Sequence, residues 1–240
     1  MIRNLLYKKE CAINQFINVR IPTVGEILDC EDGEDEYYGL ISMLTAMPVD
    51  MMVQLDDIGV DFTKIDEWEL FLILFGSLKE RDTTLVFGDL DLRPFQAAIN
   101  PQNNNVILVN KKTGVRIDRA LHSQIASVLR KIHHIEQNNR KPANGEAKEY
   151  MLRRAREKMH RQSKRLSDSQ LEGLIVALVN TEQFHYGFEE TRGLSIYQFN
   201  ESVRQVIKKI DYDNKMHGVY TGTVSAKDLS QEDLNWLIHK

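Results

Sequence analysis

The 240-residue sequence has only two cysteines, Cys11 and Cys30, and no long hydrophobic run. Two cysteines are too few for a disulfide framework and lack the spacing of a zinc site, so a reducing, cytoplasmic setting is the simplest interpretation. The longest apolar run, residues 70–75, is far shorter than the roughly 20 residues that a membrane span needs. The N-terminal residues contain no apolar segment of signal-peptide length. We therefore expect neither a disulfide scaffold nor a membrane span.

The sequence also lacks the motifs that mark common catalytic and metal sites. It has no Gly-x-Ser-x-Gly elbow, no phosphate-binding loop and no dinucleotide-binding turn. The acidic cluster at residues 29–36 does not fit a calcium loop, because Gly33 stands one position too early. His133 and His134 are adjacent, so on a helix their side chains point about 100° apart, and no third ligand is nearby. We expect no enzymatic activity, no metal and no cofactor.

What the sequence does contain is strongly segregated charge. Its formal net charge is only −4, yet residues 26–91 carry 18 acidic and 3 basic side chains. Residues 111–165 carry 16 basic and 5 acidic ones. An acidic segment followed by a basic one is typical of proteins that present complementary surfaces to a partner or to a second copy of themselves.

Apolar residues recur at helical spacing over most of the chain, so we expect a mainly α-helical α+β protein. Good N-caps precede several of these segments. They are Thr23, Asp66 or Thr63, Asp118, Ser167 or Asp168, and Ser195. A capping pair of Ser230 and Asp233 predicts a terminal helix. The predicted helices begin at Thr23, Glu36 and Pro48 and cover residues 66–76, 118–132, 146–164, 168–180 and 195–210.

Two regions favour strands. Alternating residues at 12–19 predict one edge strand, and three β-rich runs separated by polar turns predict a small antiparallel β unit at 94–118. Residues 136–146 are polar and contain Pro142 and Gly145, as linkers do. We therefore divide the chain into an acidic helical region at 1–135 with the β unit, a linker at 136–146, and a helical region at 147–240 that begins with a basic helix.

The basic helix is the strongest polar feature. At helical spacing, Arg154, Lys158, Arg161 and Arg165 lie on one stripe. Such a stripe can meet an acidic protein surface, either residues 26–91 of the same chain or a neighbouring copy. It can also contact nucleic-acid phosphates or be a plain solvated face. The acidic net charge, the scarcity of aromatics on the helix and the absence of a recognition motif favour the protein surface.

Methionines form a second candidate surface. Met43, Met47 and Met51 recur at helical spacing with Met52 beside them, and flexible thioether side chains suit an adaptable hydrophobic groove. The competing interpretation is ordinary core, which is the commoner use of such a stripe.

Several segments resemble tail-morphogenesis proteins of long-tailed bacteriophages of Gram-positive hosts, often called tail assembly chaperones. The similar segments fall within residues 20–92 and 194–238. They include Ile21-Pro22-Thr23-Val24-Gly25-Glu26, Tyr37-Tyr38-Gly39-Leu40-Ile41-Ser42, Asp66-Glu67-Trp68-Glu69-Leu70-Phe71 and Gly218-Val219-Tyr220-Thr221-Gly222. The β unit and the basic helix at 94–165 lie outside this resemblance.

The resemblance implies a protein of the host cytoplasm that binds another phage protein, such as the tape measure or the tail tube subunit, and that supplies no catalytic residues. A structural component of the virion tail or neck is a close alternative. A nucleic-acid-binding packaging or regulatory factor that uses the basic helix is another. Complementary charge on one chain also makes homo-oligomers, as a ring or filament, a plausible consequence.

Overall fold

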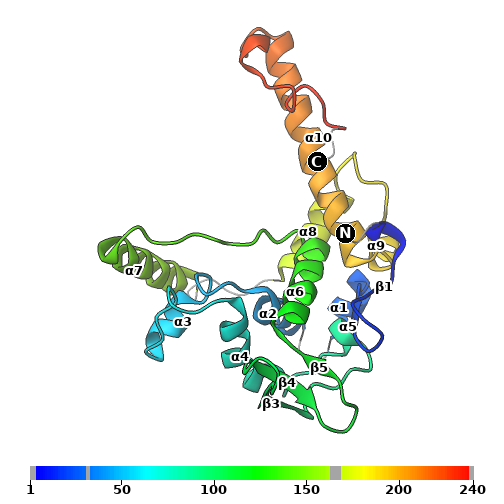
Figure 1. The fold of residues 1–240 in the computed structure, drawn as a ribbon. Helices are drawn as coiled ribbons and strands as arrows, with labels where there is room; N and C mark the ends of the chain where they lie inside the picture. Colours follow the sequence, from blue (N-terminus) through cyan, green and yellow to red (C-terminus); the bar gives the residue numbers. More distant parts are fainter. Residues whose placement is uncertain (1–3, 31–32, 163–168, 238–240) are drawn as a thin grey trace. The chain divides into compact units, whose positions relative to one another are not determined.

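The computed structural model describes residues 4–30, 33–162 and 169–237, and the structural statements below concern these residues. Its contacts divide the chain into two compact units (Figure 1). Unit 1 comprises residues 1–22 and 26–168, and unit 2 comprises residues 23–25 and 169–240. The short helix α1 (Val24–Leu28) therefore contributes to both units.

Unit 1 begins with a one-turn helix η1 (Leu5–Tyr7) and a two-stranded hairpin. Strands β1 (Glu10–Ala12) and β2 (Asn18–Arg20) are antiparallel, with Cys11 opposite Val19. The single strand predicted at 12–19 is thus wrong. The Asn14 side chain accepts hydrogen bonds from the backbone N–H groups of Phe16 and Ile17, and this side-chain turn reverses the chain.

The acidic segment folds into α2 (Glu34–Thr45), α3 (Met52–Asp57), α4 (Glu67–Leu78) and the short α5 (Thr84–Phe87). The predicted cap of α4 is confirmed, since Asp66 and Glu69 form a reciprocal capping box. Gly76 does not end α4, contrary to the prediction. The helix continues to Leu78, whose side chain is fully buried, and this burial offsets the roughly 1 kcal/mol that an internal glycine costs.

The predicted antiparallel β unit is confirmed. Strands β3 (Phe95–Ile99), β4 (Val106–Asn110) and β5 (Arg116–Ile117) form one sheet in sequence order. Ala97 lies opposite Leu108, and Leu108 lies opposite Ile117. Asp118 then caps α6 (Arg119–His133) by accepting a hydrogen bond from Leu121 N, as expected.

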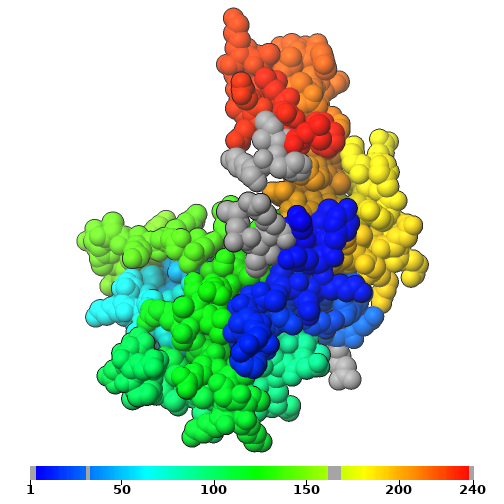
Figure 2. Space-filling model, turned by 45° about the vertical axis from the view of Figure 1, so that its right-hand side comes forward, coloured from blue at the N-terminus to red at the C-terminus, as the bar shows by residue number. Residues whose placement is uncertain are grey.

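The basic helix α7 (Gly145–Gln162) completes the described part of unit 1 and packs against α3. Figure 2 shows its light-green surface beside the cyan surface of the acidic segment. Residues 135–144, which precede α7, have no regular secondary structure. The two compact units follow tertiary contacts, whereas the division at 136–146 follows composition and stays a prediction.

Unit 2 contains α8 (Gln170–Val179), α9 (Phe188–Arg192) and the 25-residue α10 (Ile196–Tyr220). The first turn of α1 joins this unit, because Val24 N donates to Leu194 O. At Gly25 an added Cβ would lie 3.1 Å from Arg192 O, so a larger residue would require the backbone at Arg192 to shift by a few tenths of an ångström.

The predictions for unit 2 are correct at the helix starts and wrong at the C-terminal end. Ser169 caps α8, whereas the two residues expected to cap it, 167 and 168, lie outside the described part of the chain. Helix α10 runs ten residues past the predicted end. Ser230 and Asp233 do form the reciprocal capping bonds, yet residues 230–237 form turns rather than a helix.

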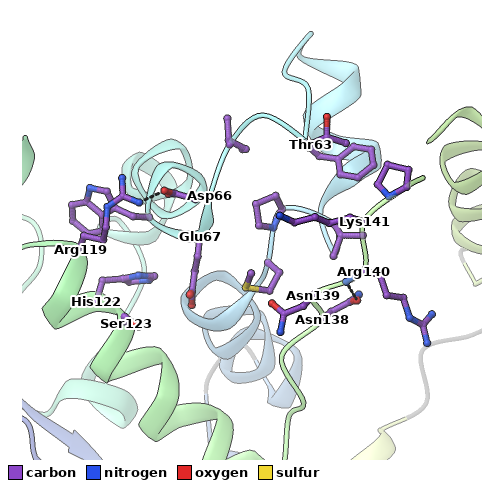
Figure 3. Close-up of a pocket in the computed structure, with 17 residues that line it drawn as sticks. Thr63, Asp66, Glu67, Arg119, His122, Ser123, Asn138, Asn139, Arg140 and Lys141 are labelled. Atoms are coloured by element: carbon purple, nitrogen blue, oxygen red, sulfur yellow. Dashed lines mark hydrogen bonds and ion pairs between the residues drawn. The ribbon is translucent and has the colours of Figure 1, made fainter. Parts of the chain in front are cut away.

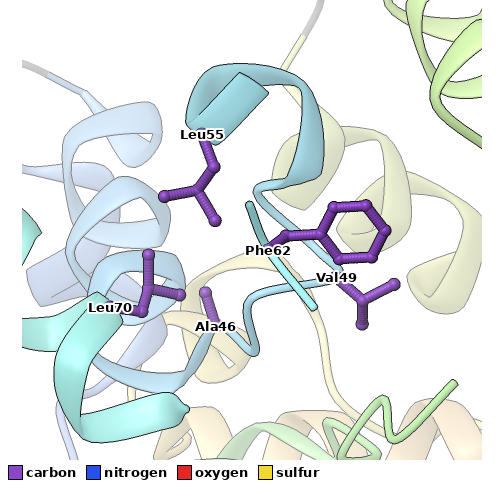
Figure 4. Close-up of a cluster of buried hydrophobic side chains, with 5 residues drawn as sticks. All are labelled: Ala46, Val49, Leu55, Phe62 and Leu70. Carbon is purple, nitrogen blue, oxygen red and sulfur yellow. The ribbon is translucent and has the colours of Figure 1, made fainter. Parts of the chain in front are cut away.

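The fold class is α+β and mainly α-helical, as the sequence predicts. No helix in the described ranges is long and apolar enough to cross a membrane. In unit 1, one cluster of buried side chains holds the connections between α2, α3 and α4 together (Figure 4). It consists of Ala46, Val49, Leu55, Phe62 and Leu70.

A buried arginine ties α2, α4 and α6 together. Arg130, on α6, is 8% exposed. Its Nη2 lies 2.6 Å from Glu67 Oε1 on α4 and donates to the carbonyl oxygen of Thr45, the last residue of α2. The guanidinium therefore supplies a donor to a helix C-terminus whose carbonyls have no partner within the helix.

We predict that R130M destabilises unit 1 by about 3–5 kcal/mol, because it leaves the Glu67 carboxylate buried without its cation. The measurement is urea unfolding in a W236F background, where Trp68 is the remaining tryptophan and reports on unit 1.

R119M is the matched control. Arg119 is also on α6 and pairs with the neighbouring carboxylate Asp66, but its side chain is 59% exposed. We expect this control to lose about 1 kcal/mol or less. Equal losses in the two variants would contradict a structural role for the buried pair.

Candidate interaction site

Helix α7 uses some of its cations to bind the chain's own acidic segment. Lys148 Nζ lies 2.8 Å from Asp61 Oδ1, and Arg156 Nη2 lies 2.7 Å from carboxylate oxygens of both Asp56 and Asp57. The hydrogen bond from Lys148 holds the pKa of Asp61 well below its usual range. The sequence prediction that the basic helix meets an acidic surface thus has an intramolecular counterpart on one face of the helix.

Apolar contacts reinforce that face. Met151 and Leu152 pack against the Ala46–Val49–Leu55–Phe62–Leu70 cluster, and Lys148 Nζ lies 5.8 Å from the centre of the Phe62 ring. Residues 148, 151, 152 and 156 follow helical spacing, so one side of α7 is anchored on α3 and the segment after it.

The predicted basic stripe lies on other positions of α7. Arg154, Lys158 and Arg161 are all exposed, and the side chains of the two arginines are 63% and 77% exposed. Both arginines lie 4.0 Å from Glu157 on the same helix. Such exposed pairs contribute little to stability. The fourth stripe residue, Arg165, lies outside the described ranges.

The predicted methionine surface is partly packed. Met47 and Met51 contact the same hydrophobic cluster as Met151 and Leu152, whereas Met43 lies half-buried on α2. Met47 Sδ also accepts hydrogen bonds from Arg130 Nη2 at 3.6 Å and Gln137 Nε2 at 3.2 Å. Met47 and Met51 therefore pack with the anchored side of α7 rather than with its exposed stripe.

A pocket of about 430 Å³ opens beside Met47 (Figure 3). One wall comes from the starts of α4 and α6, with Trp68 and the Asp66–Arg119 ion pair. Residues 138–142 form the opposite wall. Asn138 Nδ2 donates a hydrogen bond to Asp50 Oδ1 at 2.7 Å, which attaches this segment to the residues after α2. Its volume is within the range of about 300–1,000 Å³ that is typical of ligand pockets.

His122 lines this pocket from α6, and Figure 3 shows its ring directed toward Glu67. The ring is 3% exposed and stacks on Phe71, with ring centres 4.1 Å apart. Burial and the nearby Arg130 cation lower its pKa to about 4, so the ring is neutral at pH 7. Nε2 has no hydrogen-bond partner among the described residues.

Sequence reasoning missed this pocket because its residues come from segments far apart in the chain. A signal did exist: His122 falls on the apolar stripe of α6 with Ile125, Leu129 and Ile132, all buried. A polar residue on such a stripe has either a buried partner or a site to face.

In the described ranges no group of three or more His, Cys, Asp or Glu side chains is arranged to hold a metal ion.

The comparison with protein families adds information on the C-terminal part of the chain. Residues 161–239 match a family model described as the YomV second domain. The YomV family is phage-derived, so the match supports the bacteriophage origin that the resemblance implied. It spans about a third of the chain and contains the segment of unit 2 at 169–237. No curated protein and no solved structure matches the chain.

Two histidines of α6, the buried His122 and the half-buried His133, predict acid sensitivity of unit 1. Burial lowers the pKa values of both His122 and His133 to about 4, and an unfolded histidine has a pKa of about 6.5. Between these pKa values the unfolded chain binds more protons than the folded chain does. The contribution of the neutral histidines to the free energy of unfolding is therefore fully present above about pH 6.5 and falls as the pH drops toward 4.

We expect this loss to approach about 1.4 kcal/mol per pH unit for each histidine in the window. Urea unfolding of the W236F protein at several pH values measures it. H133F removes one titrating group, together with the hydrogen bond between Tyr37 Oη and His133 Nε2, so its stability at pH 7 falls while its pH slope becomes shallower. A slope equal to that of W236F would show that His133 does not titrate as proposed.

Proposed function

We propose that the protein acts in bacteriophage tail assembly by binding another protein, in the manner of a chaperone for the tape measure or the tail tube subunit, and that it is not an enzyme. The observation that carries this proposal is the division of cations on α7. Lys148 and Arg156 anchor the helix on the acidic segment, while Arg154, Lys158 and Arg161 remain exposed. An anchored helix with an exposed basic face is a preorganised docking element.

The exposed face favours an acidic protein surface over nucleic acid. Glu157 lies 4.0 Å from both Arg154 and Arg161, so a carboxylate stands within the stripe. That carboxylate repels backbone phosphates, whereas on a protein partner it can pair with a lysine or arginine set among acidic residues. The YomV match and the segments similar to tail-morphogenesis proteins support the phage setting.

A tail assembly factor of this kind works in the host cytoplasm or enters the particle with its partner. The acidic residues that Lys148 and Arg156 contact are already used within the chain. Self-association through the stripe therefore needs other carboxylates of a second copy.

We predict that the triple variant R154E/K158E/R161E loses binding to its phage partner by tenfold or more, while the free energy of unfolding changes by about 0.5 kcal/mol or less because these side chains are exposed. The experiment is co-purification of the tagged full-length chain with tail proteins from phage-infected cells, followed by titration of the captured partner.

K111E/K112E/R116E is the matched control, since it reverses three exposed cations of the β4–β5 region in the same unit. This control keeps wild-type binding if the stripe is the docking surface. The proposal fails if no tail protein co-purifies, or if both variants bind as well as the wild type. Binding to duplex DNA with a steep salt dependence that the stripe variant removes would instead favour the nucleic-acid function.

A further inference from the structure

We propose that α10 is a self-association surface, on which an exposed apolar stripe packs antiparallel against the same stripe of α10 in a second copy of the chain. This inference concerns unit 2 and goes beyond the proposed function, because the partner is the chain itself. It uses no residue of the basic stripe on α7, so the two surfaces can be tested separately.

The apolar stripe of α10 extends beyond the part of the helix that unit 2 covers. Near the start of α10, Ile196, Phe199 and Val206 are buried, whereas Ile207 is 62% exposed and Ile210 is 38% exposed. Helix α8, which contacts α10, has 10 residues and α10 has 25 (Figure 1). At 1.5 Å per residue, α8 cannot follow α10 over its whole length. Apolar side chains in line on an exposed helix face indicate a partner.

The C-terminal segment of the chain contacts α10 on other positions. Trp236 lies over Lys209, whose Nζ is 5.7 Å from the ring centre, and Asp233 Oδ1 lies 2.6 Å from Lys215 Nζ. Ile207 stays exposed with this segment in place. The occupant of the stripe therefore comes from another molecule.

The spacing of the stripe is that of a coiled-coil seam. Its positions 200, 203, 207, 210 and 214 alternate steps of three and four residues, as the a and d positions of a heptad do. We call these five positions the α10 seam. Its centre is apolar, and an asparagine occupies each end, Asn200 and Asn214. Such a seam is complementary to a second helix, and its polar ends limit the contact to a short length.

The charges beside the α10 seam select a second copy as the occupant and antiparallel as its direction. Arg204 and Asp211 each stand four residues after a seam position, so they flank the seam on the same side. A two-fold axis perpendicular to two antiparallel helices brings this side of one copy against the same side of the other. Arg204 then lies beside Asp211 of the second copy, and the midpoint of the pair falls beside Ile207, the centre of the seam. A parallel pair would instead place the two charges beside Phe199 and Val206, which are buried and uncharged.

Intrahelical ion pairs extend this contact. Arg204 Nη2 lies 2.7 Å from Glu201 Oε2, and Asp211 Oδ2 lies 2.5 Å from Lys215 Nζ. The side chains of Arg204 and Asp211 are nevertheless 49% and 58% exposed, so both can reach a second copy. Across the two-fold axis the charges alternate in sign from Glu201 to Lys215. An alternating network fixes the direction of pairing, although each exposed pair contributes little alone.

The test measures the mass of the full-length chain by analytical ultracentrifugation. We expect the weight-average mass to rise from 27.8 kDa toward twice that value, with a dissociation constant on the order of 10–100 µM because the apolar centre is short. I207D/I210D should weaken association tenfold or more. L174D/V176D is the matched control, since it changes two exposed aliphatic side chains of α8 in the same unit. It should associate as the wild type does.

A charge exchange tests the direction and the partner together. R204E gives the flank two acidic residues and D211R gives it two basic ones, so each variant alone should associate about fivefold more weakly. An equimolar mixture of R204E and D211R should recover association as a heterodimer, and the double variant R204E/D211R should recover it alone. A purely structural role of these side chains would not produce recovery on mixing.

The inference is overturned if the wild-type mass stays at 27.8 kDa up to about 200 µM, or if I207D/I210D associates as the wild type does. Equal weakening by L174D/V176D, or no recovery on mixing the charge variants, also contradicts it. Association that is lost in R154E/K158E/R161E and kept in I207D/I210D would assign self-association to the basic stripe. Failure to capture a phage protein would contradict the proposed function and leave this inference standing.

Discussion

The buried Arg130 guanidinium is the interaction on which the organisation of unit 1 depends. It joins three helices that are far apart in sequence, by pairing with Glu67 at the start of α4 and donating to Thr45 at the end of α2. Two helix ends of opposite polarity therefore meet at one side chain of α6. His122, also on α6, forms a hydrogen bond with the backbone of Leu44, the residue before Thr45 on α2. At the C-terminus of α2, the backbone of Leu44 and the carbonyl oxygen of Thr45 thus form hydrogen bonds with side chains of α6.

The segregated charge of the sequence has a physical explanation in how α7 is held. Lys148 and Arg156 contact Asp61, Asp56 and Asp57, so part of the basic segment neutralises part of the acidic one within the chain. Exposed ion pairs alone would hold the helix weakly. Met151 and Leu152 supply the apolar contact that makes the orientation definite. Because that contact selects one face of α7, it also decides which cations stay exposed.

The sequence predicts those parts of the fold that local chemistry determines. The caps at Asp66 and Asp118 and the β unit are correct because a cap or a turn is decided within a few residues. The end of α10 was not predictable from apolar spacing alone. Beyond residue 210 its ion pairs Lys209–Asp213 and Lys215–Asp211 stabilise it. At the C-terminus, Asp233 pairs with Lys215, so it contacts α10 as well as Ser230.

The candidate pocket was not predictable for a different reason. Its residues are separated by up to 95 positions, and the wall at 138–142 lies in the segment that composition marked as a linker. That wall ends three residues before α7 begins, so the pocket and the basic stripe belong to one continuous stretch of unit 1.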